Sequence, residues 1–194
     1  AIDLKQEQNL ALAAIRNIQL AVRRVYRVVL EVARELYPES WRSLKPRLLT
    51  VASWVGYDLD GRSDVRWSDT LRCRMEVEVE QLSIYLHRIR GLSEQHQGAI
   101  SVLPLASSNL NLIEEKIRTT NYAASSDFDL LGAGVESAEE VQRLGVQLLR
   151  SLDVRLIDTG FAVDKLSEII DGCDDTPLVS DLCILRAEMA NYGL

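Results

Sequence analysis

Two aspartates between two glycines are the residues whose types and spacing could support chemistry. Asp58 and Asp60 belong to the stretch Ser-Trp-Val-Gly-Tyr-Asp-Leu-Asp-Gly-Arg, which occupies residues 53–62. Paired carboxylates can act as an acid and a base, or as ligands of a cation. Gly56 and Gly61 allow the backbone to turn tightly on either side of them. We therefore take this stretch as the candidate site.

Three interpretations of these carboxylates can be compared from the residues alone. A calcium-binding loop fails, because its first ligand position would be Gly56 and its closing glutamate position would be Trp67. Acid–base catalysis requires a turn that brings both carboxylates to one site. In a structural role, the aspartates would cap loop amides and pair with Arg62 or Arg66, which is the commoner role for an isolated Asp-x-Asp-Gly sequence.

The element that leads into this stretch has the composition of a β-strand. Residues 48–55 read Leu-Leu-Thr-Val-Ala-Ser-Trp-Val, which is short, apolar, rich in β-branched residues and bounded by turn residues. It is the one strand that the sequence predicts, and one strand cannot form a sheet. We expect it either to pair with a segment outside these residues or to be irregular.

A long helix is predicted over residues 3–36, ending before Pro38. Its apolar residues recur in steps of three and four and predict a buried stripe, with arginines on the opposite side. The expected stripe contains Ala11, Ile15, Ile18, Val22, Val25, Val29, Val32 and Leu36, widened by Leu10, Ala14, Ala21 and Val28. Such a face needs a partner, which can be the rest of the domain or a second copy.

The rest of the sequence predicts further helices and few breaks. Capping and spacing signals indicate helices at 68–90, 108–121, 137–158, 161–172 and 176–192, with a polar loop or frayed helix at 91–104 and a surface loop at 123–136. A capping box is predicted at Ser137–Glu140, and the last helix is predicted to have Thr176 as its cap, Pro177 at its first helical position and Gly193 as its stop. The predicted fold is mainly α: one domain over residues 1–194, a multi-helix bundle with a short extended segment at 48–55.

Charge and composition limit the function classes. The net charge of −7 argues against a broad nucleic-acid surface, although residues 1–74 carry +4 and residues 75–194 carry −11. These charges either solvate helix faces or mark an anion site near the basic N-terminal part. No apolar stretch is long enough to span a membrane. The three cysteines have no paired short spacing, so we expect buried thiols and a cytoplasmic protein.

The stretch at 53–62 resembles the phosphoenolpyruvate carboxylase signature Ser-Trp-Met-Gly-Gly-Asp-Arg-Asp-Gly-Asn. It shares the serine, Trp54, both aspartates and two glycines, and it departs at Val55, Tyr57, Leu59 and Arg62. The C-terminal Asn-Tyr-Gly-Leu is similar to the family's run into its next barrel strand. The resemblance covers most of residues 40–194 and implies an internal segment of a divergent member, from the helical part of an α/β-barrel enzyme.

This resemblance implies roles for individual residues. Trp54 would form an apolar wall of the active site, Asp58 and Asp60 would organise its loop, and Arg62 would contact substrate. The family makes oxaloacetate and phosphate from phosphoenolpyruvate and bicarbonate, using Mg²⁺ or Mn²⁺ held by residues that have no counterpart here. We therefore expect no metal or other cofactor to bind this chain alone.

The family's catalytic histidine motif, Thr-Ala-His-Pro-Thr, is also absent, and His87 and His96 are expected to be surface residues. The chain alone is thus expected to be inactive and to have the remainder of the parent enzyme as its partner, or a second copy bound through residues 3–36. The alternative function is a non-catalytic helical interaction or regulatory module derived from the same family, without nucleic-acid or membrane partners.

Overall fold

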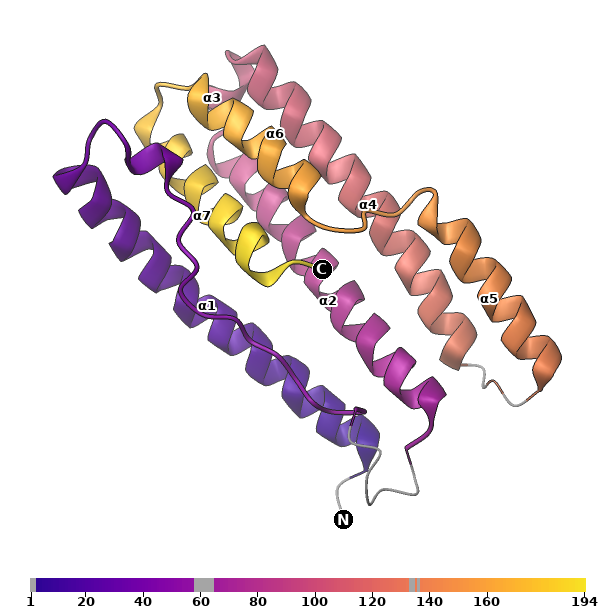
Figure 1. Ribbon diagram of the computed structural model, residues 1–194. Coiled ribbons are helices and arrows are strands. Elements are labelled where there is room, and N and C mark those ends of the chain that lie inside the picture. Colours follow the sequence, from indigo (N-terminus) through magenta and orange to yellow (C-terminus); the bar gives the residue numbers. More distant parts are fainter. Residues whose placement is uncertain (1–2, 58–64, 133–134, 136) are drawn as a thin grey trace.

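The predicted bundle forms from seven α-helices and one short 3₁₀ turn within the part of the chain that the structure describes (Figure 1). The computed structural model describes residues 3–57, 65–132, 135 and 137–194. The elements are α1 (Leu4–Leu36), η1 (Trp41–Ser43), α2 (Trp67–Gln95), α3 (Gln97–Ser101), α4 (Pro104–Gly132), α5 (Ala138–Leu152), α6 (Gly160–Asp171) and α7 (Thr176–Tyr192). None of these described helices combines the length and the hydropathy needed to cross a bilayer.

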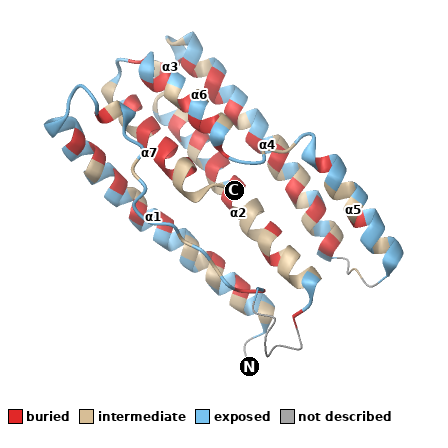
Figure 2. Ribbon diagram, in the orientation of Figure 1, coloured by how far each residue is buried: buried red, intermediate tan, exposed pale blue. Residues whose placement is uncertain are grey.

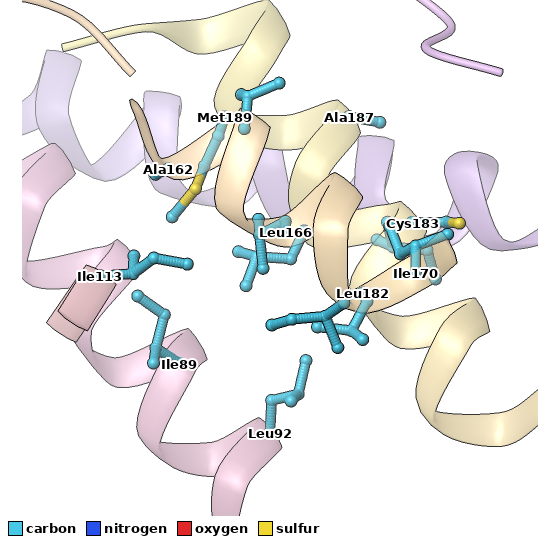
Figure 3. Close-up of a cluster of buried hydrophobic side chains, with 14 of the residues drawn as sticks. Ile89, Leu92, Ile113, Ala162, Leu166, Ile170, Leu182, Cys183, Ala187 and Met189 are labelled. Carbon is cyan, nitrogen blue, oxygen red and sulfur yellow. The ribbon is translucent and has the colours of Figure 1, made fainter. Parts of the chain in front are cut away.

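The core lies around α7, which packs against α1, α2 and α6. Ten residues of this helix are buried (Figure 2), and eight of them, at 182–189, are consecutive and therefore lie on all of its sides. Leu182 of α7 and Leu166 of α6 converge with Ile89 and Leu92 of α2 in one apolar layer (Figure 3). Full burial of a leucine or isoleucine side chain stabilises the fold by about 1.5–3 kcal/mol, so this layer is the main source of stability.

Helix α5 belongs to a second, much smaller cluster. Its Leu144 packs with Met75 of α2 and Leu131 of α4. The predicted capping box holds the start of the helix, because Glu140 N–H donates to Ser137 Oγ at 3.2 Å and Ser137 N–H donates to the Glu140 carboxylate at 2.8 Å. Figure 1 shows α5 beside the C-terminal half of α4, away from α7. Few apolar contacts therefore hold this end of the bundle.

The bounds of α1 are confirmed, but the predicted buried stripe is largely wrong. The helix begins after Asp3, whose carboxylate caps Gln6 N–H at 2.7 Å, and it ends at Leu36. Its buried residues are Gln8, Leu12, Gln19, Val22, Tyr26, Leu30 and Ala33. Most of the predicted stripe faces outward instead, including Val25, Val28, Val32 and Leu36. The helix has apolar residues over more than half of its circumference, and periodicity alone does not decide which part is buried.

Some helix ends were predicted correctly and others were not. The helix predicted at 108–121 runs from Pro104 to Gly132, so the surface loop predicted at 123–136 is wrong over most of its length. Helix α2 extends to Gln95, and the residues predicted as a polar loop or frayed helix at 91–104 contain the end of α2 and α3. Asp175 rather than Thr176 caps α7, so Pro177 is the second residue of the helix rather than the first, and Gly193 ends the helix with φ of 67°.

The three cysteines are buried, as predicted, which leads to the first testable prediction. Burial raises the pKa of the Cys183 thiol to about 11 and also raises the pKa of the Cys73 thiol. Because the thiolate is the reactive form, Ellman's reagent is expected to leave the native protein unmodified and to titrate all three thiols after denaturation. Rapid reaction of any one thiol in the native protein would contradict this packing.

Candidate functional site

Residues 44–57 run back along α1 (Figure 1). Their last five residues, 53–57, are the described part of the candidate site. The buried strand predicted at 48–55 is not formed: among the described residues no strand pairs with this segment, and Leu48 and Leu49 are exposed. Helix α7 fixes its course instead. The Arg186 guanidinium donates to the carbonyls of Arg42 and Leu44, and the Asn191 amide donates to the Leu49 carbonyl. The segment is therefore irregular in this chain, and the alternative that it pairs with a segment outside these residues stays a prediction.

A tight turn follows this segment at residues 54–57. Tyr57 N–H donates to the Trp54 carbonyl at 2.9 Å, and the hydroxyl of Thr70 in α2 donates to the Gly56 carbonyl. Gly56 has φ of 81°, and a Cβ at this position would lie 2.9 Å from Cys73 Sγ. Both the positive φ and the lack of room for a Cβ atom require glycine at this position. The turn is thereby pressed against the first turns of α2.

Trp54 lies on an open apolar groove between this segment and α1. The groove has a volume of about 410 Å³ and is lined by residues 51–55 together with Ala11, Ala14, Ile15 and Ile18. The Trp54 side chain is 80% exposed, an unusual state for so large an apolar group. None of the described residues that line the groove carries a charge, so these residues offer an apolar wall but no acid, base or metal ligand.

Of the four predicted site residues, the structure places Trp54. Asp58, Asp60 and Arg62 lie outside the described residues, so their roles remain predictions. The segment re-enters the described chain beside α2, where Asp69 Oδ2 accepts from Arg66 N–H at 2.9 Å. The described residues before position 58 are thus held by the Gly56 turn, and those after position 64 by the cap of α2.

The described residues offer no alternative metal centre or histidine base near the groove. In the part of the chain that is described, no three His, Cys, Asp or Glu side chains lie close enough to hold a metal ion. The divalent ion implied by the family resemblance therefore has no ligand set among these residues. His87 is exposed as expected, but the prediction for His96 is wrong, because it is largely buried and its Nε2 lies 2.9 Å from Asp181 Oδ2.

A charged cluster between α1, α2 and α7 was not predicted from the sequence. Arg23 of α1 and Arg88 of α2 both contact Glu188 of α7, whose side chain is 2% exposed. The row of arginines on α1 was the available signal, but it was assigned to the solvent side. Burying Tyr26 rather than Val25 turns Arg23 toward the bundle. Relative to the prediction, α1 is turned about its own axis, and this single difference accounts for both the outward apolar face and the inward Arg23.

Comparison with known proteins adds no assignment, since no protein-family model, curated protein or solved structure matches this chain.

Proposed function

We propose that this chain is part of a phosphoenolpyruvate carboxylase-like enzyme and that residues 53–62 contribute one wall of its active site. The supporting observation is the turn after the extended segment, where a signature glycine at 56 has positive φ and Trp54 is exposed beside it. A glycine required by both conformation and space fits a loop built to hold a fixed shape. The exposed Trp54 side chain fits an apolar wall that a bound ligand would cover.

The proposed reaction gives the residues of the 53–62 stretch separate roles. Bicarbonate attacks the phosphoryl group of phosphoenolpyruvate, which breaks the bond to the enolate oxygen and forms carboxyphosphate. Carboxyphosphate then divides into carbon dioxide and phosphate, and the enolate takes up the carbon dioxide to give oxaloacetate. Trp54 would shield the enolate from water, Asp58 and Asp60 would hold the loop, and Arg62 would bind the negative substrate. A divalent ion, when bound by the complete enzyme, supplies charge stabilisation. The described residues lack such a site, so we propose that the chain alone is inactive.

The outward apolar face of α1 also supports this proposal. Val25, Val28, Val32 and Leu36 are exposed along the C-terminal part of this helix and recur in steps of three and four. Single exposed apolar residues are ordinary on protein surfaces, but a continuous row along a long helix is typical of a packed interface. We propose that the remainder of the parent enzyme covers this row.

The test uses the protein encoded by the complete reading frame that contains residues 1–194. Oxaloacetate is measured by coupling to malate dehydrogenase in the presence of phosphoenolpyruvate, bicarbonate and Mg²⁺. We expect activity from the complete protein and none from the 194-residue chain. Trp54→Ala is expected to lower kcat/KM by about tenfold or more, because the enolate would be exposed to water.

Trp67→Ala is the matched control, because Trp67 is also an exposed tryptophan but begins α2 and does not line the groove. It is expected to keep kcat/KM within about twofold of the unmodified enzyme. A folded complete protein that makes no oxaloacetate would refute the proposed function. Equal effects of the two substitutions would refute the role of Trp54.

A further inference from the structure

Helix α1 has two halves that are held by different kinds of contact. The half from residue 21 onward packs into the main apolar core through Val22, Tyr26, Leu30 and Ala33. In the half before it, residues 4–20, the buried residues are Gln8, Leu12 and Gln19. None of these three belongs to either apolar cluster of the described chain. The main core thus fixes the second half of α1 and not the first.

Buried polar contacts join the first half of α1 to α2. Gln8 Nε2 donates to the Cys73 carbonyl at 3.2 Å, and Gln19 Nε2 donates to Gln81 Oε1 at 2.7 Å. Gln8 Oε1 is buried as well, but no described group donates a hydrogen bond to it. Burying an amide costs its hydration, and the hydrogen bond it then makes returns little more than that cost. These contacts therefore align α1 with α2 but stabilise the docked helix only weakly.

A third contact in the same half is open to solvent. Arg16 Nη1 lies 2.7 Å from Glu80 Oε1, and the two side chains are 46% and 29% exposed. Water and salt screen an ion pair of this kind, so it contributes little to stability. Hollows also adjoin this half of the helix: a cavity of about 300 Å³ between α1 and α2, and the Trp54 groove, which shares no lining residue with it. Close packing is therefore missing here.

Leu12 is the one apolar side chain among the buried residues of this half. Its burial is the main apolar contribution to docking, whereas four apolar side chains hold the second half. A helical segment as short as residues 4–20 is marginally stable in water without packing. Loss of a few polar contacts and one leucine contact is thus enough to release these residues, and the released residues would then lose their helical structure.

We propose that residues 4–20 form a latch, which leaves α2 and docks again while residues 21–36 and the rest of the bundle stay folded. In the docked state, Ala11, Ala14, Ile15 and Ile18 of the latch form one wall of the Trp54 groove, opposite residues 51–55. Release of the latch removes this wall. A molecule that binds in the groove therefore favours the docked state. The latch is a property of the fold and does not depend on the proposed carboxylase function.

Native-state hydrogen exchange, read by mass spectrometry on the 194-residue chain, tests the latch. Backbone amides of residues 8–20 are expected to exchange at least about tenfold faster than those of residues 22–33, because local opening needs less free energy than global unfolding. Leu12→Ala is expected to remove the remaining protection of residues 8–20, while residues 22–33 stay protected. Replacing both amides of the buried pair, with Gln19→Leu and Gln81→Leu, is expected to slow exchange in the latch by about fivefold or more.

Leu30→Ala is the matched control, because Leu30 is an equally buried leucine of α1 but belongs to the main core. It is expected to lower the urea midpoint of unfolding much more than Leu12→Ala does, since the loss at Leu12 cannot exceed the small free energy of docking. If Leu30→Ala does not fold, the exchange pattern of Leu12→Ala decides the question. Uniform exchange along α1, or loss of protection in both halves together, would overturn the proposal, as would equal midpoint shifts for the two leucine variants.

Discussion

Substitution of Arg155 by methionine is expected to lower the free energy of unfolding by about 3–5 kcal/mol, the usual cost of removing one partner from a buried ion pair. Arg155 follows α5 and joins two carboxylates from other helices. Its Nη1 donates to Asp127 of α4 at 2.9 Å, and its Nη2 donates to Glu78 of α2. Asp127 is fully buried and Glu78 nearly so. Methionine fills much of the same volume but leaves both carboxylates unpaired.

Urea denaturation followed by circular dichroism measures this loss. Arg118→Met is the matched control, because Arg118 pairs with Glu115 on the exposed side of α4 and is expected to leave the unfolding midpoint unchanged. Adding Asp127→Asn to Arg155→Met is expected to restore part of the lost stability, because it removes one uncompensated charge. An Arg155→Met protein as stable as the original would show that the ion cluster does not hold α4, α5 and α2 together.

Substitution of Gly56 by alanine is expected to lower the free energy of unfolding by about 2–4 kcal/mol, from the unfavourable left-handed conformation and from overpacking together. The added methyl carbon would lie 2.9 Å from Cys73 Sγ and 3.0 Å from Cys73 Cβ, at a φ of 81°. The first turns of α2 would have to move away. Because this turn positions residues 54–57, the same substitution is expected to abolish activity in the complete protein.

Gly91→Ala provides a control with the opposite expected sign. Gly91 lies within α2, is exposed, and has no atom near its hypothetical Cβ. Alanine there is expected to stabilise the protein by about 0.5–1 kcal/mol, because it favours the helix. Combining Gly56→Ala with Cys73→Ala is expected to recover part of the loss by removing the sulfur. If Gly56→Ala and Gly91→Ala shift the unfolding midpoint in the same direction, the proposed constraint at Gly56 is wrong.

Local signals in the sequence predicted the helices and several of their ends. The bounds of α1, the Ser137–Glu140 capping box, Pro177 in the first turn of α7 and the terminal Gly193 all depend on neighbouring residues. Such features are set by contacts within one turn of chain, so the sequence carries them directly. The same holds for the tight turn that the signature glycine at 56 was expected to allow.

Features set by distant residues could not be predicted in this way. Residues 123–132 looked like a loop because they are rich in small and polar residues, yet Asp127 is buried there by Arg155 and Ser151. Residues 48–55 have strand composition, but backbone pairing needs a neighbour that composition does not supply. The burial of Tyr26 instead of Val25 in α1 depends on the shape of α7. In each case the deciding contact lies far away in sequence.

The functional residues differ in the same way, because only some of them are close together in sequence. Trp54 and Gly56 could be singled out because a contiguous signature contains them. The Arg23–Glu188–Arg88 cluster could not, because its members come from three helices separated by up to 165 positions. No spacing rule connects such residues before the helices are packed. Our proposed carboxylase function rests on the first kind of signal.

The burial of α7 on all sides has a consequence for how this molecule can adapt. A helix enclosed by α1, α2 and α6 can neither turn about its axis nor slide lengthwise without displacing side chains on every neighbour at once. It serves as a fixed reference for the segment that leads to Trp54, because Arg186 and Asn191 tie that segment to it. Helix α5 packs mainly against α4, and none of its residues lines the Trp54 groove. Insertions or deletions in α5 are therefore expected to disturb that groove least.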